Sequence, residues 1–268
     1  MPGSSHSPAM KISHGMIVQP RDVAFLGVLA LLGVVDREQF KIVAGFTSTT
    51  RANTRLLQLV RAGLLRRFFL GSGGGRKALY ALSAKGAQLA GVAYRGPRRR
   101  QEEVLVADFY IQHQLAINEV YCSLKHRSIP VSGVTFVKWL VFHELIAASL
   151  KLIPDGYVVL ATPADKVNAF LEVDLGHEGL TVWREKARQY RELAVSGAFE
   201  RRFQEKRFRV LVLVNSERRL HSIRRAVSTV TEKIFWFATI ESTGNNFFAP
   251  VWFRPTGDQP KPLIEDQI

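Results

Sequence analysis

Three acidic residues stand inside or beside runs of apolar residues in the second half of the chain. Asp155 precedes the apolar run of IPDGYVVL, and Glu172 and Asp174 alternate with apolar residues in AFLEVD. A buried carboxylate without a partner costs several kcal/mol or takes up a proton, so each of these acids needs a cation nearby. The fold must therefore bring positive charge to the end of a buried strand.

Strand geometry places two of these acids on one face. Side chains alternate along a strand, so Glu172 and Asp174 point to the same side, about 7 Å apart along the chain. Antiparallel pairing with the run that starts at Asp155 would bring that carboxylate beside Glu172. Three gathered acids repel one another and suit a hard divalent cation, Mg²⁺ or alternatively Mn²⁺. We therefore predict Asp155, Glu172 and Asp174 as metal ligands.

The segment WREKARQY supplies a cation close to these acids. It predicts a helix with Lys186 and Tyr190 on one face, four residues apart. If that face turns toward the acids, Lys186 can stabilise a phosphate that a metal-activated water attacks. The alternative is an exposed acidic strand end that pairs with Arg184 or Arg188.

Composition favours a nucleic-acid partner. The 268 residues include 37 Lys and Arg against 23 Asp and Glu, a net charge of +14, which attracts polyanions. The 47% hydrophobic share is enough for real cores. One cysteine, Cys122, excludes an internal disulfide and fits a cytoplasmic protein. The apolar run VAFLGVLALLGVV is short for a membrane span, and we expect no membrane partner.

Shifts in composition divide the chain into segments. Residues 1–18 read as a flexible leader, and 19–95 as three helices and a hairpin. The charged stretch 96–103 reads as a linker. Strands and then alternating helices and strands over 104–254 predict an α/β sheet layered by helices. The Pro-rich end, 255–268, reads as a mobile tail.

The first domain resembles winged-helix domains through TRLLQLVRAGLLRR followed by ALYALSAKGAQLA. In that fold the third helix enters the DNA major groove and the hairpin touches the backbone. The alternative is a winged helix that docks on protein. The resemblance, with the chemistry of Arg, Asn and Lys toward bases and phosphates, nominates these DNA contacts: Thr49, Thr50, Arg51, Asn53, Arg55, Arg66, Arg67, Arg76 and Lys77.

The motifs IPDGYVVL, FLEVD and KARQY, followed by FRVLVLV, resemble the replication-relaxation family of plasmid and mobile-element proteins. The resemblance implies a restriction-endonuclease-like fold over residues 104–254, and some members act as mobilisation relaxases. By position, Asp155 and Glu172 match the two metal-binding acids of such nucleases. The usual Lys two residues after the second acid is Asp174 here. Either Lys186 replaces that lysine, or the site has decayed.

These observations predict a metal-dependent endonuclease or nickase that acts on double-stranded plasmid or mobile-element DNA. Asp155, Glu172, Asp174 and Lys186 are its predicted catalytic residues. The alternative is a DNA-binding replication accessory factor or transcription regulator without catalysis, whose nuclease-like domain dimerises. A homodimer and replication or mobilisation proteins are the expected protein partners. Glu119 and Glu178 are lesser candidates for the same site.

Overall fold

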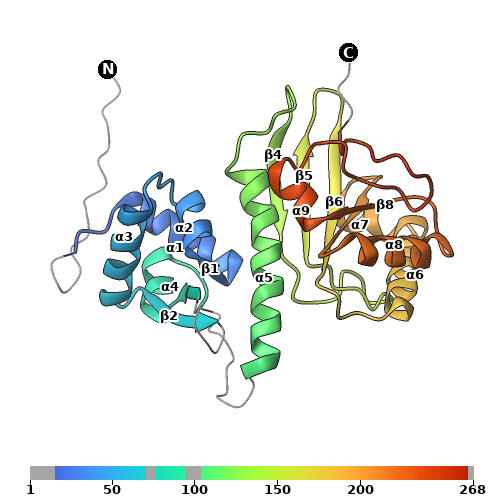
Figure 1. Cartoon of the computed structure of the whole chain (residues 1–268). Helices are drawn as coiled ribbons and strands as arrows, with labels where there is room; N and C mark the ends of the chain where they lie inside the picture. Colours follow the sequence, from blue (N-terminus) through green and yellow to red (C-terminus); the bar gives the residue numbers. More distant parts are fainter. Residues whose placement is uncertain (1–15, 71–76, 95–103, 265–268) are drawn as a thin grey trace. The chain divides into compact units, whose positions relative to one another are not determined.

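The computed structural model describes residues 16–70, 77–94 and 104–264, with the side chains of 104–107 left out (Figure 1). Most of the predicted leader, the hairpin tip with Arg76, and the predicted linker 96–103 lie outside the described residues. The chain forms two compact units, Met1–Asn118 and Glu119–Ile268. The division falls within one helix, α5 (Val104–Lys125), rather than in the segment whose composition predicts a linker.

The first unit contains the predicted three helices followed by two hairpin strands, together with one strand that was not predicted. That strand, β1, follows Gly33, whose positive φ of 73° ends the first helix earlier than its apolar pattern suggests. Three antiparallel strands form a sheet in the order β1, β3, β2. The elements are α1 (Pro20–Leu32), β1 (Val34–Asp36), α2 (Arg37–Val43), α3 (Thr49–Arg61), β2 (Leu65–Leu70), β3 (Lys77–Leu82) and α4 (Ala84–Ala90).

Side-chain caps fix where three helices of this unit begin. The carboxylate of Asp36 accepts the Gln39 N–H at 2.8 Å and so caps the start of α2. Ser48 begins α3 and Ser83 begins α4 in the same way. Each such cap is worth about 1 kcal/mol of helix stability.

The first half of α5 packs on this unit. Leu115 joins Val34 and Leu79 in a small apolar cluster. The buried Asn118 amide donates to the carbonyls of Leu32 and Val34 at 3.2 and 2.6 Å. The strand β1 therefore has side-chain hydrogen bonds that hold it beneath α5.

The second unit contains a mixed sheet in the order β4, β5, β6, β7, β8. Its first three strands are antiparallel and its last three are parallel, with helices crossing between the parallel strands. This arrangement confirms the predicted α/β class. The elements are β4 (Thr135–Leu140), β5 (Gly156–Ala161), β6 (Lys166–Asp174), α6 (Leu180–Val195), α7 (Ala198–Phe203), β7 (Arg209–Val214), α8 (Glu217–Ser228), β8 (Phe235–Thr239) and α9 (Ile240–Asn245).

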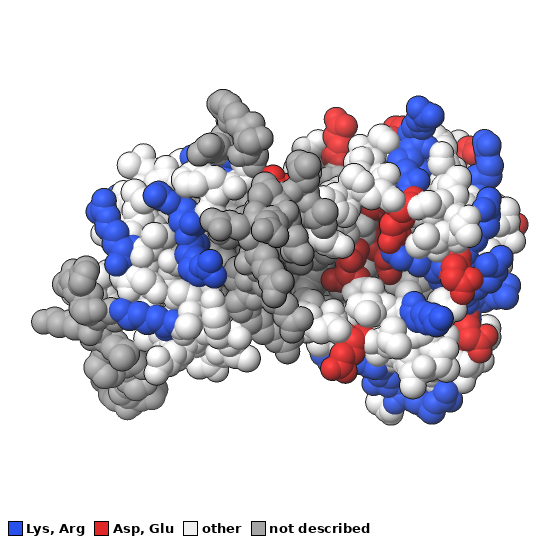
Figure 2. Space-filling view, turned by 90° about the horizontal axis from the view of Figure 1, so that it is seen from below, with Lys and Arg blue, Asp and Glu red and all other residues white. Residues whose placement is uncertain are grey.

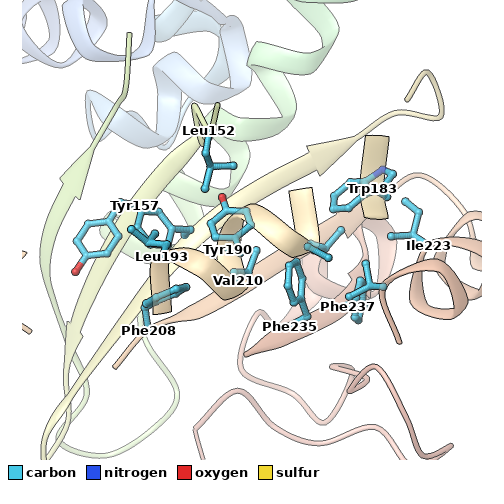
Figure 3. Packing of buried hydrophobic residues seen from close by; sticks show 14 of the residues in the cluster. Leu152, Tyr157, Trp183, Tyr190, Leu193, Phe208, Val210, Ile223, Phe235 and Phe237 are labelled. Atoms are coloured by element: carbon cyan, nitrogen blue, oxygen red, sulfur yellow. The ribbon is translucent and has the colours of Figure 1, made fainter. Parts of the chain in front are cut away.

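An aromatic core lies between α6 and the sheet (Figure 3). Trp183 and Tyr190 of α6 are fully buried there, and Phe170 of β6 lies 5.5 Å from Tyr190 between ring centroids. Strand alternation places Glu172 and Asp174 on the face that Phe170 presents to the core. The same periodicity that builds the core therefore carries two carboxylates beneath α6.

Residues 255–264 are ordered against the second unit, although their composition suggests a mobile tail. Leu263 is 1% exposed, and Lys261 pairs with Trp252 through two backbone hydrogen bonds. Arg224 donates to the Gly257 carbonyl. Within the described chain, the helices do not reach the combined length and apolarity of a bilayer-crossing segment.

Candidate active site

Glu172 is a buried carboxylate with two partners on α6. It stands near the end of β6 and is 1% exposed. The Tyr190 hydroxyl donates to its Oε1 at 2.5 Å, and the Lys186 ammonium donates to its Oε2 at 2.8 Å. Lys186 and Tyr190 therefore share a helix face turned toward the acid, as their four-residue spacing predicts.

Lys186 lies between two carboxylates. Besides Glu172, it reaches Glu178 at 2.8 Å in the turn before α6, and its ammonium lies 5.0 Å from the Trp183 ring centroid. Its side chain keeps 23% exposure. The ammonium is thus held at the boundary between the core and solvent, where an anion could approach it.

Burial and charge act against each other at this pair. Burial raises the pKa of Glu172 to about 7; Lys186 opposes that rise, and the nearby Asp155 carboxylate adds to it. Burial disfavours the charged form of Lys186, but Glu172 and Glu178 outweigh it and raise the Lys186 pKa above its usual value. Burial and Glu172 also raise the Tyr190 pKa, so this residue donates a hydrogen bond as a neutral phenol. Glu172 therefore remains short of positive charge even with Lys186 beside it.

Asp155 lies just before β5, where the sheet brings it next to Glu172. The antiparallel register pairs Gly156 with Leu171, so Asp155 stands opposite Glu172 one residue further along. The Asp155 N–H donates to the Leu171 carbonyl at 3.1 Å, and the Asp155 Oδ2 accepts the Val173 N–H at 2.7 Å. Two of the three predicted metal ligands thus meet at one sheet edge.

Asp174 occupies a different environment from the one predicted. Its Oδ1 accepts from the Gly176 N–H at 2.5 Å and Arg219 Nε at 3.1 Å, while its Oδ2 accepts from Trp183 Nε1 at 2.7 Å and from Arg219 at 2.6 Å. These bonds occupy the acceptor positions of a carboxylate. In the described part of the chain, no three His, Cys, Asp or Glu side chains gather as a metal-holding group. The expected cluster of three acids is therefore a pair, with Asp174 tied to Arg219.

Arg219 is the residue that sequence reasoning missed. It stands in the first turn of α8 and is far from Asp174 in sequence, but parallel pairing aligns Asp174 with Val214, the last residue of β7. The carboxyl ends of neighbouring parallel strands meet at one edge of a sheet. The helix that follows β7 therefore delivers Arg219 to Asp174, and the signal lay in the segment VNSERR.

The alternative of an exposed acidic strand end is wrong. Glu172 and Asp174 are 1% and 2% exposed, and neither pairs with Arg184 or Arg188. Arg188 pairs instead with Glu185 on the surface of α6. The lesser candidate Glu119 pairs with Arg127 at 2.5 Å. Figure 2 shows acidic side chains gathered on one face of the second unit, with Lys and Arg beside them.

Three of the nominated DNA contacts are exposed arginines on the surface of the first unit. Arg51 on α3 and Arg66 and Arg67 on β2 are exposed, and Arg67 lies over the Phe69 ring. Two other candidates already have side-chain partners, since the Thr49 hydroxyl accepts from Lys41 and Lys77 pairs with Asp36. The Thr50 carbonyl accepts from the Thr54 hydroxyl within α3, and Asn53 is half-buried.

Arg55 does not face outward as predicted. Its Nε donates to Asp22 Oδ1 at 2.9 Å, and a second nitrogen bonds the other Asp22 oxygen. The Arg55 and Asp22 side chains are 11% and 2% exposed. The guanidinium neutralises a buried acid of α1, so it fixes α3 to α1 instead of presenting charge to a ligand.

The fold and site define a class of protein: a two-unit chain with a helix-rich first unit and an α/β second unit that holds an acid pair and a lysine at its sheet edge. Residues 26–206 match the sequence profile of the replication-relaxation family, and the chain belongs to that family. No curated protein matches the chain.

A search of solved structures found the restriction endonuclease FokI, with 11% identity and a TM-score of 0.35. The match covers 84% of this chain and 42% of that chain, so this chain spans less than half the length of FokI.

Proposed function

We propose that this protein is a DNA-binding, metal-dependent endonuclease or nickase that acts on plasmid or mobile-element DNA. The observation that carries the proposal is the buried Glu172 with Lys186 on one side and Asp155 on the other. An acid pair can hold a catalytic metal ion, and a neighbouring lysine can stabilise the charge on a phosphodiester during hydrolysis. Membership of the replication-relaxation family supports a role on DNA.

Asp155 and Glu172 are suited to hold Mg²⁺ or Mn²⁺. Both offer carboxylate oxygens, the ligands such ions prefer. Burial together with the Asp155 charge raises the Glu172 pKa, which is the condition that a bound cation relieves. When bound, such an ion supplies Lewis acidity to a phosphodiester.

Lys186 would place its ammonium against the phosphate. Its position at the boundary of the core, with part of the side chain exposed, suits an approaching anion. A phosphate there would compete with Glu178 for the ammonium, because Glu178 is the more exposed of its two carboxylate partners. Tyr190 would hold the Glu172 carboxylate in place through its hydrogen bond.

DNA binding is assigned to α3 and the hairpin of the first unit. Arg51 leads this set because it is exposed on α3, and Arg66 and Arg67 offer two further charges on β2. Arginine can make bidentate contacts with base edges or phosphates. Double-stranded DNA is therefore the proposed partner, and its affinity should fall steeply with salt.

The test is nicking of a supercoiled plasmid by the full chain with Mg²⁺, Mn²⁺ or EDTA. Asp155→Asn and Glu172→Gln should each abolish nicking that wild type shows with either ion. Glu185→Gln removes an exposed acid from the same helix as Lys186 and should nick like wild type. Equal nicking by wild type and all three variants would show that Asp155 and Glu172 take no part in the reaction.

A second function is favoured by a specific observation. Asp174 pairs with Arg219 and Glu172 pairs with Lys186, so each of these buried carboxylates already has a cationic partner within the chain. Such a network suits a DNA-binding replication factor without catalysis, in which the second unit serves dimerisation or partner docking. Specific DNA binding by Arg51-dependent contacts, with plasmid unchanged under every metal condition, would establish this function instead.

A further inference from the structure

A cavity of about 850 Å³ lies at the end of the second unit's sheet opposite Glu172. Its lining includes the first residues of β6, Arg209 at the start of β7, and Trp236 near the start of β8. Glu172 and Asp174 stand at the other end of β6. The cavity is therefore separate from the candidate active site.

The described lining is strongly basic. It contains five cationic side chains and one acid, Asp165, and one of those cations, Lys166, pairs with Glu205 at 2.9 Å. Even without Arg209, which bonds the Leu263 carbonyl, the cations Lys206, Arg207 and Arg254 against Asp165 leave an excess of two positive charges, which suits an anion with several charges. The five cations are Lys166, Lys206, Arg207, Arg209 and Arg254.

Two guanidinium groups lie against one aromatic ring in this lining. The central carbons of Arg209 and Arg254 lie 4.6 and 4.7 Å from the centroid of Trp236. Arg254 also donates to the Glu232 carbonyl at 3.4 Å, and no carboxylate pairs with it in the part of the chain that the structure describes. Burial lowers the Arg254 pKa, as expected for a cation that has given up water without gaining an opposite charge.

The wall beside these cations is apolar. Phe208, Ile234 and Val134 join Trp236 in the lining. Pockets for small ligands are about 300–1,000 Å³ and combine an apolar wall with a few convergent polar groups, a description that this cavity meets.

We propose that this cavity binds a nucleoside phosphate, with the phosphates on Lys206, Arg207 and Arg254 and the base against the apolar wall. The charge excess suits a diphosphate or triphosphate, and arginine binds phosphate with paired hydrogen bonds. The ligand is either a free nucleotide or a nucleotide within a single DNA strand. This site does not depend on cleavage, because it shares no residue with the acid pair and Lys186.

Fluorescence anisotropy of labelled ATP, titrated with the full chain in EDTA, tests the proposal. Wild type should bind saturably with one nucleotide per chain. The double substitution Lys206→Gln/Arg207→Gln alters two exposed residues and should weaken binding about tenfold or more, since it removes two phosphate contacts. Arg254→Gln should weaken it similarly, which provides a second variant at a different place in the fold.

The matched control is Arg218→Gln/Arg225→Gln, which removes two exposed charges from α8 outside the cavity. It should leave ATP affinity within about twofold of wild type, because neither residue lines the cavity and exposed charges are screened by salt. Equal weakening by both double variants, or no saturable binding by wild type, would overturn the proposal. If unlabelled ATP displaces the labelled ATP but a short single-stranded oligonucleotide does not, the ligand is a free nucleotide. If the oligonucleotide also displaces it, the ligand is a nucleotide within a DNA strand.

Discussion

Lys186 Nζ lies 2.8 Å from Glu172 Oε2, so helix α6 brings a cation to a carboxylate that strand β6 buries. The acid is 2% exposed and the lysine 23% exposed at the side chain. One partner of this pair cannot regain water if the other is removed. The pair therefore links the stability of the second unit to the chemistry proposed for its edge.

Replacing Lys186 should destabilise the protein in a pH-dependent way. Lys186→Met leaves Glu172 buried without its cation, which costs about 3–5 kcal/mol when the acid is ionised. The loss should be larger at pH 8 than at pH 5, because Glu172 can protonate at the lower pH. Urea denaturation at the two pH values measures the free energy of unfolding. Lys166→Met breaks an exposed pair and should cost about 1 kcal/mol or less at both.

Glu172 should make the protein less stable as pH rises from about 5 to 7. Its pKa is raised from 4.5 in a free chain to about 7 in the fold, so the folded state binds more protons between these values. Stability falls with pH wherever the folded state holds the extra proton. Glu172→Gln should flatten this part of the profile. Glu192→Gln changes an exposed acid of α6 and should retain the slope; an unchanged slope in Glu172→Gln would contradict the assignment.

Arg219 should be a structural requirement of the second unit. Its side chain neutralises Asp174, whose side chain is 0% exposed. Arg219→Leu should cost about 3–5 kcal/mol at neutral pH. Arg219→Lys should restore only part, since an ammonium cannot make the paired contacts of a guanidinium. Thermal unfolding measures both, with Arg218→Leu as the exposed neighbour; a wild-type Tm in Arg219→Leu would refute this role.

Protonation of Asp174 should contribute to the loss of folding stability at low pH. Burial disfavours its charge, but hydrogen bonds from Arg219, Trp183 and the Gly176 N–H outweigh burial and lower its pKa below 3.8. The stabilisation is present above pH 3.8 and is lost as pH falls through the lower, folded-state pKa. Arg219→Leu should therefore lose less additional stability than wild type between pH 5 and pH 3. If wild type and Arg219→Leu lose equal stability between pH 5 and pH 3, Arg219 is not what lowers the Asp174 pKa.

Arg51 and Arg55 should have opposite effects although both lie on α3. Arg51→Ala should weaken double-stranded DNA binding by about 1–3 kcal/mol and leave thermal stability near wild type. Arg55→Ala should lower thermal stability, because it leaves the buried Asp22 carboxylate without its cationic partner. Anisotropy with labelled duplex and thermal unfolding separate the two effects. Arg188→Ala is a charge-matched control on the second unit.

The sequence was informative where local rules decide the structure. The four-residue helix spacing correctly placed Lys186 and Tyr190 on one face of α6, and the structure turns that face toward Glu172. The sequence was not informative where a distant element supplied the partner. Arg219 reaches Asp174 through the parallel pairing of β6 with β7, and Asp22 reaches Arg55 from another helix. Both arginines satisfy acids that are remote in sequence, which periodicity cannot reveal. The charged run around Lys206 precedes β7 and therefore lies at the end of the sheet opposite the acids, which its composition alone does not reveal.

The most direct measurement is Mn²⁺ binding to the full chain, followed by electron paramagnetic resonance of the unbound ion. Wild type should take up one Mn²⁺ per chain, and Asp155→Asn and Glu172→Gln should each weaken that uptake at least about tenfold, since each removes a carboxylate ligand. Glu185→Gln should bind like wild type. No uptake by wild type, or equal uptake by all four proteins, would contradict a metal site at Asp155 and Glu172.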